Sequence, residues 1–170
     1  LKIDFMLEDS EDLITESLDG SERVRKIVQN LKTFSRVDQA EEQWVDLNTC
    51  LENTIGIVWN EIKYKSKLEK DLGDLPDLNC NPQELSQVFT NIFINAAQAI
   101  EKDGLIKVRS RHEEESIIIT IEDNGSGIAE EHLERIFEPF FTTKAVGEGA
   151  GLGMSISYEI IKKHGGNIHI

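Results

Sequence analysis

The sequence predicts an α+β protein in which a long bundle helix precedes a domain of helices and strands. The bundle helix is indicated by a seam of apolar residues spaced 3-4-3, formed by Val24, Ile27, Leu31 and Phe34. From Trp44 onward, apolar residues switch between helical spacing and strand alternation, and glycine-rich turns separate the segments. The 170 residues are enough for one ordinary domain plus a small appendage.

The bundle helix is expected from about Ser10 to Arg36; we assign residues 1–37 to it and residues 38–43 to a polar linker. Charged residues flank its seam, which suits an antiparallel helical hairpin or a dimer bundle. An amphipathic helix packed on its own domain would show the same pattern, so both arrangements stay open.

The domain is expected to span residues 44–170 and to begin with a strand from Trp44 to Leu47. Asn48 is a good N-cap residue, so we expect it to start the following helix. That helix carries its apolar residues on one side. A second strand is expected from Lys67 to Leu72.

A long helix is expected after a turn over residues 75–82. Pro82 suits its first turn, where no amide donor is lost, and Asp103-Gly104 would end it. Two alternating apolar runs then predict a pair of strands joined by an acidic turn, at Leu105–Arg111 and Ser116–Glu122.

The last third of the chain is expected to contain two helices. A short helix is predicted at Glu130–Ile136 and a longer one at about Leu152–Lys163, where Gly165-Gly166 stops it. Asn167 to Ile170 would begin a strand, and we expect the final strand of the domain to be missing from this chain.

The long helix carries two asparagines on one face. Asn91 and Asn95 are four residues apart, so they lie one turn apart beside an apolar stripe. Asparagine is a poor helix former, so this alignment indicates a polar role. Hydrogen bonding of both side chains to neighbouring backbone is the alternative.

Two glycine turns flank an aromatic, threonine and lysine cluster between Glu122 and Met154. Backbone amides at such turns, next to a helix start, form anion sites, so the pair predicts a phosphate cradle. One such turn alone would more simply be a hairpin or a helix cap. Neither turn matches a Walker loop or a dinucleotide fingerprint.

Four segments in this order resemble the sequence boxes of sensor histidine kinases, which belong to the GHKL group of ATP-binding domains. NxxxNAxxA resembles the N box, DNGSGI the first glycine box, FEPFFTTK the F box and GxGLGM the second glycine box. The resemblance covers about residues 43–170. It implies a two-layer α/β sandwich of the GHKL type, with a mixed sheet and helices on one face. Residues 1–37 would then be the second helix of a dimerisation and phosphotransfer domain.

The resemblance places adenine at the first glycine box. Asp123 follows a predicted buried strand, so its carboxylate can point into a pocket and accept a hydrogen bond from the adenine amine. A turn-capping role for this side chain is the alternative. Gly125, Gly127 and Ile128 would complete this part of the ATP site.

The resemblance gives the two asparagines different roles. Asn95 would ligate the Mg²⁺ that bridges the phosphates, because an amide oxygen suits a hard cation. Asn91 stands where hydrolysing relatives such as DNA gyrase carry a glutamate that activates water. An amide is no general base near neutral pH, which favours phosphoryl transfer over hydrolysis. We therefore assign Asn91 to ATP binding and catalysis.

The F box and the second glycine box would hold the phosphates. Lys144 would offset charge near the γ-phosphate in the transition state, or would simply be a solvated lysine. Ala150 departs from the threonine or serine commoner in the family and so removes a hydroxyl. The other residues assigned to ATP in these boxes are Thr142, Thr143, Gly149, Ala150, Gly151, Leu152 and Gly153.

The resemblance also implies partners. None of the four histidines fits the phosphoacceptor, so the acceptor histidine is expected on a dimerisation helix absent from this chain. ATP, Mg²⁺, a response-regulator receiver domain and a homodimer of the full-length protein are implied, and the fragment alone is not expected to autophosphorylate. Two alternatives stay open: a GHKL serine kinase of the anti-sigma type, and a nucleotide-responsive interaction module with little activity.

Composition limits the remaining functions. The net charge of -14 disfavours nucleic acid as a partner. No apolar run reaches the roughly 18 residues of a membrane span, so a cytoplasmic location is expected, with any anchor of the parent protein elsewhere. Cys50 and Cys80 lack metal-type spacing and are expected to be buried free thiols.

Overall fold

A computed structural model describes the domain nearly completely and the bundle helix at scattered positions. The described residues are 13–14, 17–18, 20–21, 25, 41–144 and 149–170. The described residues of the predicted bundle helix are helical, and Leu13 and Leu18 are exposed. The 3-4-3 seam and residues 38–40 of the predicted linker lie outside the described residues.

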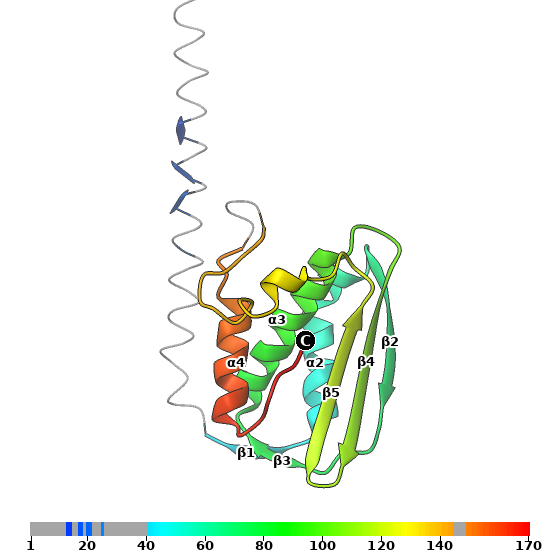
Figure 1. Ribbon diagram of the computed structural model, residues 1–170. Coiled ribbons are helices and arrows are strands. Elements are labelled where there is room, and N and C mark those ends of the chain that lie inside the picture. Colours follow the sequence, from blue (N-terminus) through cyan, green and yellow to red (C-terminus); the bar gives the residue numbers. More distant parts are fainter. Residues whose placement is uncertain (1–12, 15–16, 19, 22–24, 26–40, 145–148) are drawn as a thin grey trace, which may run out of the picture.

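The domain consists of a sheet covered on one face by three helices (Figure 1). The three-stranded sheet has the order β2-β4-β5, with β2 parallel and β5 antiparallel to β4. A small antiparallel pair, β1 and β3, lies at one end of the domain. The predicted mixed sheet with helices on one face is therefore confirmed. In chain order the elements are β1 (Gln43–Val45), α2 (Leu47–Ile62), β2 (Ser66–Leu72), β3 (Leu78–Cys80), α3 (Pro82–Ala99), β4 (Gly104–Glu113), β5 (Ser116–Asp123), η2 (Glu130–His132) and α4 (Gly153–Lys163).

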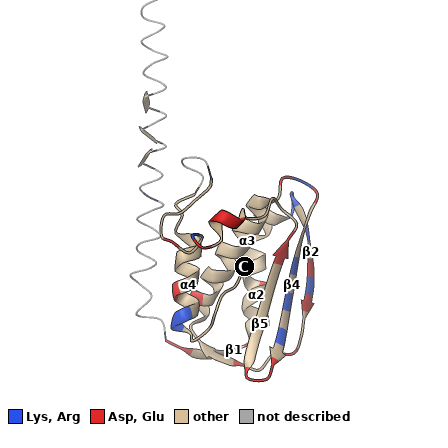
Figure 2. Cartoon of the chain, in the orientation of Figure 1, with Lys and Arg blue, Asp and Glu red and all other residues tan. Residues whose placement is uncertain are grey.

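Side chains of the central strand β4 alternate between the core and solvent. Ile106, Val108 and Ser110 are fully buried. The residues between them carry positive charge and meet acidic residues of both neighbouring strands (Figure 2). These surface pairs are Lys107 with Glu69, Arg109 with Glu122, and Arg111 with Asp71. Exposed pairs of this kind add little stability, so this face is a solvated surface.

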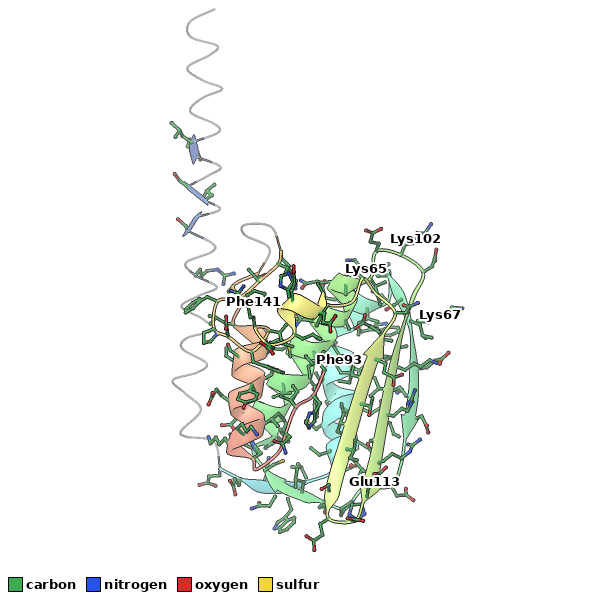
Figure 3. All side chains as sticks on the ribbon, viewed as in Figure 1. Lys65, Lys67, Phe93, Lys102, Glu113 and Phe141 are labelled. Atoms are coloured by element: carbon green, nitrogen blue, oxygen red, sulfur yellow. The ribbon has the colours of Figure 1, made fainter. Side chains whose placement is uncertain are left out.

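The hydrophobic core lies between the sheet and the helices. Phe93 of α3 is fully buried at its centre (Figure 3), where Leu51 and Ile62 of α2 are equally inaccessible. Ile156 and Ile160 add the apolar face of α4. Helix α3 packs against both α2 and α4. Its apolar face lies in the core, and its polar face lies next to α4.

The predicted start of the first helix is wrong by two residues. Asp46, in an extended conformation, caps α2: its Oδ1 accepts from Asn48 N at 2.8 Å. The side chain of Asn48 instead joins the helix to the sheet, because its Nδ2 donates to Gly73 O and its Oδ1 accepts from Ser110 Oγ. The first strand correspondingly ends at Val45 rather than Leu47.

Four further boundaries differ from the predictions. Residues 78–80 form strand β3 where a turn was predicted, because they find a partner in β1. Helix α3 ends at Ala99, before the predicted stop at Asp103-Gly104. The predicted helix Glu130–Ile136 is a 3₁₀ turn over its first three residues. Asn167–Ile170 is not a strand, and none of the described residues pairs with it.

The remaining expectations for the core are met. Cys50 and Cys80 are buried free thiols, as predicted. Among the described helices, none has both the length and the apolar character needed to cross a membrane.

Candidate nucleotide-binding site

Helix α3 is capped at its N-terminus and carries a polar face. Asn81 Oδ1 accepts hydrogen bonds from Gln83 N and Glu84 N, and Pro82 occupies the first turn. The eighteen-residue helix then places Asn91, Asn95 and Gln98 on one face, at i, i+4 and i+7. The site is built along this face.

Asn91 joins α3 to the start of α4. Its Nδ2 donates to Gly153 O at 3.0 Å and to Ser157 Oγ at 3.2 Å. Ser157 Oγ also donates to Gly153 O at 2.8 Å. These partners lie more than sixty residues along the chain, so both hydrogen bonds are tertiary and the local-backbone alternative is wrong for Asn91.

Asn95 accepts a cationic hydrogen bond from the F box. Lys144 Nζ donates to Asn95 Oδ1 at 3.2 Å and also to Gln98 Oε1. The backbone amide of Lys144 donates to Thr142 Oγ1, which fixes the turn that carries the lysine. Lys144 is thus bound to α3 rather than simply solvated. Sequence reasoning missed Gln98, although its position three residues after Asn95 on the same face could have indicated it.

Asp123 caps the first glycine turn. It is exposed at the end of β5, and its Oδ1 accepts from Gly125 N at 2.9 Å. The turn-capping alternative is therefore realised, and the expectation that this carboxylate points away from water is wrong, because Asp123 is exposed. Oδ2 makes no hydrogen bond to another described residue, so one carboxylate oxygen can still meet an amine.

The first glycine turn packs against the end of α3. A Cβ on Gly125 would lie 2.5 Å from Ala99 O, so only glycine fits there. Ser126 N donates to the same oxygen at 3.0 Å. Gly127, with φ +70°, has open space where a Cβ would stand, and Ile128 is 47% exposed. The backbone of Gly127 and the side chain of Ile128 are therefore accessible to a flat ligand.

The F box and the second glycine box are tied together. Phe140 N donates to Gly151 O at 2.8 Å. Gly151 has φ +65°, and a Cβ there would lie 2.4 Å from Phe140 C. Phe140 itself has φ +69° although it is an aromatic residue, and it is 63% exposed. A left-handed aromatic of this kind persists only where its surroundings hold it, which is typical of functional segments.

The start of α4 is open to an anion. Leu152 occupies the N-cap position, no described side chain caps the first turn, and that turn contains no acidic residue. The amides of Gly153, Met154 and Ser155 therefore lack partners within the helix, and the helix dipole adds partial positive charge. Gly149 lies close to Thr142 and Lys144 on the approach to these amides. Thr142 and Thr143 are exposed, and Ala150 packs against the core.

The histidines most closely held by the fold serve packing and capping. His164 Nε2 accepts from Asn81 N at 3.1 Å, so the proton lies on Nδ1, which donates to Ile160 O. His132 stacks edge-on against Phe141, with ring centroids 5.4 Å apart. Both histidines are thus held by contacts within the domain.

Comparison with known proteins gives a consistent family. Residues 80–170 match the family model described as histidine kinase-, DNA gyrase B- and HSP90-like ATPase. The sensor histidine kinase ZraS of Escherichia coli O157:H7 is 35% identical over 152 residues, covering 88% of this chain and 33% of that protein. The signal transduction histidine-protein kinase AtoS of Escherichia coli K12 is 37% identical over 153 residues, covering 86% of this chain and 24% of that protein.

A solved catalytic domain agrees with these relatives. The nucleotide-free catalytic domain of the histidine kinase ThkA is 28% identical, with a TM-score of 0.66, covering 73% of this chain and 82% of that one. The chain spans about a third or less of the length of the curated relatives above. Together these similarities confirm the resemblance carried by the four boxes.

Proposed function

Since this chain belongs to the histidine kinase-, DNA gyrase B- and HSP90-like ATPase family, we propose that it is the catalytic part of a two-component sensor histidine kinase. It would bind ATP and transfer the γ-phosphate to a histidine on a dimerisation helix outside this sequence. The phosphoryl group would then pass to an aspartate of a response-regulator receiver domain. The full-length protein would act as a homodimer on the cytoplasmic side. Its named relatives are sensor kinases.

The observation that carries this proposal is the hydrogen bonding of Asn91. Its amide holds the start of α4, whose first turn has no side-chain cap among the described residues, against α3 one helical turn before Asn95. The residue at this place has no basic group to activate water. The geometry therefore supports binding and positioning of a triphosphate for transfer rather than its hydrolysis.

ATP would lie across the two glycine turns. Asp123 Oδ2 would accept from the adenine amine, while Gly125, Gly127 and Ile128 line the base. The phosphates would meet the amides at the start of α4, reached past Gly149, Ala150, Gly151 and Leu152, with Thr142, Thr143 and Lys144 on the opposite side.

The described residues also fit Mg²⁺. Asn95 Oδ1 already accepts an ammonium group, so this oxygen is accessible to a cation and oriented to hold one. Mg²⁺ binds in nucleotide sites through few protein oxygens together with phosphates and water, and its charge would neutralise the phosphates. Asn95 is the residue that would hold it.

The proposal is tested by supplying radiolabelled ATP, Mg²⁺ and a separately produced acceptor-helix domain. Acid-labile, base-stable label on the acceptor domain is expected, because phosphohistidine has that stability. Acid-stable label on serine would support the anti-sigma type of kinase instead.

A second outcome would favour an interaction module. Ala150 packs against the core at a position where threonine or serine is commoner in the family. Its methyl side chain has no polar group that could bind phosphate. Nucleotide binding in calorimetry without phosphoryl transfer to any acceptor would favour the interaction module. If Ala150→Thr then transferred the phosphoryl group, the defect would be assigned to this position.

A further inference from the structure

Lys144 forms a bridge between the F box and α3. Its ammonium donates to two amide oxygens one turn apart, Asn95 Oδ1 at 3.2 Å and Gln98 Oε1. We refer to these two oxygens as the cation seat. The lysine reaches the seat from a turn fixed by Thr142 Oγ1, forty-six residues beyond Gln98 along the chain.

We propose that Lys144 is a built-in competitor for the cation seat, held there by Gln98 and displaced when a metal–nucleotide complex binds. This inference rests on the proposed function, because it takes Asn95 as the ligand of Mg²⁺. It adds a role for Gln98, which positions Lys144, and a role for Lys144 as an occupant of Asn95 Oδ1 that competes with the metal.

The competition follows from charge and geometry. Mg²⁺ binds its oxygen ligands at about 2.0–2.1 Å, and an ammonium group hydrogen-bonded to the same oxygen would lie within a few ångströms of it. Like charges at that separation repel strongly in a partly buried site. Lys144 and Mg²⁺ therefore cannot both occupy Asn95 Oδ1.

The two amides of the seat have different tasks. Asn95 is partly buried and faces the site, whereas Gln98 is exposed at the edge of the helix. Gln98 supplies a second acceptor for the ammonium, which favours the arrangement in which Lys144 binds Asn95. A ligand without phosphates or metal, such as adenosine, does not displace Lys144. The competition therefore affects only the binding of the metal–nucleotide complex.

The decisive variant is Gln98→Leu, which keeps the side-chain size and removes one acceptor. Calorimetry with the Mg²⁺ complex of the imido analogue of ATP is expected to show about two- to fivefold tighter binding, the lower part of the range for one hydrogen bond. Adenosine affinity is expected to stay unchanged. Gln83→Leu, an exposed glutamine at the other end of α3, is the matched control and should bind both ligands as the wild type does.

Two results would overturn the inference. Weaker binding of the Mg²⁺ complex to Gln98→Leu would make Gln98 part of the metal–phosphate site rather than a support for Lys144. Unchanged binding would show that the bridge has no energetic link to the nucleotide. If the wild type binds neither adenosine nor the Mg²⁺ complex, the proposed function fails by itself.

A measurement without nucleotide tests the bridge independently. Acetic anhydride should acetylate Lys144 faster in Gln98→Leu than in the wild type, because the ammonium loses an acceptor that holds it on α3. Lys102, whose side chain is 83% exposed at the turn before β4 (Figure 3), is the internal reference and should react equally in both proteins. Equal rates at Lys144, read by mass spectrometry, would refute the bridge.

Discussion

Gly151→Ala should damage the site far more than its size suggests. Gly151 has φ +65°, and a Cβ there would lie 2.4 Å from Phe140 C and 2.6 Å from Phe140 O. These neighbours are backbone atoms and cannot rotate away. The F box must therefore shift, and the hydrogen bond from Phe140 N to Gly151 O is strained or lost.

The magnitude can be separated into two parts. The left-handed conformation costs an alanine about 1 kcal/mol relative to glycine. Overpacking against fixed backbone typically adds about 1–3 kcal/mol. Gly165→Ala is the matched control, because Gly165 has φ +72° but open space where its Cβ would stand. Gly165→Ala should thus lose only about 1 kcal/mol and Gly151→Ala about 2–4 kcal/mol.

The assay is urea denaturation of both variants, followed by calorimetry with the Mg²⁺ complex of an ATP analogue. Gly151→Ala should lose more free energy of unfolding than Gly165→Ala and should also bind the analogue more weakly, whereas Gly165→Ala binds normally. Equal losses of stability with equal affinities would refute the reasoning, because the tie between the F box and the second glycine box would then be unimportant.

Four further predictions concern single side chains. Asp123→Asn should lower ADP affinity about tenfold or more, because a charge-assisted contact to the base is lost; unchanged affinity in calorimetry contradicts the adenine role. Asn95→Ala should abolish the Mg²⁺ enhancement of analogue binding while sparing adenosine, and equal losses with and without Mg²⁺ speak against the ligand assignment. Asn91→Glu should gain no ATP hydrolysis and should bind the analogue weakly, because a carboxylate cannot donate to α4; a rise in phosphate release would contradict this. Burial raises the pKa of the Cys80 thiol from 9.0 to about 11, so the unfolded chain ionises first and the free energy of unfolding should fall between those pH values. Urea titrations of Cys80→Ala should show a smaller fall, because burial also raises the pKa of the Cys50 thiol, which remains; an identical slope in the variant would assign the fall to other groups.

The features set by local spacing could be predicted from sequence. Helix α3, its proline in the first turn and the shared face of Asn91 and Asn95 all follow from residues within a few turns of each other. The mixed sheet likewise agrees with the predicted runs at β2, β4 and β5.

The sequence predictions were wrong, or missed a residue, where contacts between residues far apart in the chain determine the structure. Asp46 and Asn48 are both good caps, and Asn48 lost that role because Gly73 and Ser110 bind its side chain. Strand β3 has only three residues, too few for a pattern, and it exists because β1 lies beside it. Gln98 and Lys144 meet across forty-six positions, a contact that no local rule contains.

Asn91 shows why chemistry and fold cannot be separated at this site. Sequence reasoning assigned significance to this amide for what it lacks, a basic group that could activate water. The structure adds what it supplies, two hydrogen bonds to the first turns of α4. A glutamate here would have to accept rather than donate, facing the carbonyl of Gly153 with negative charge. The start of α4, where we propose that phosphate binds, would then lose its attachment to α3. In the proposed site, the residue expected to disfavour hydrolysis would therefore also be the one that holds the start of α4 against α3.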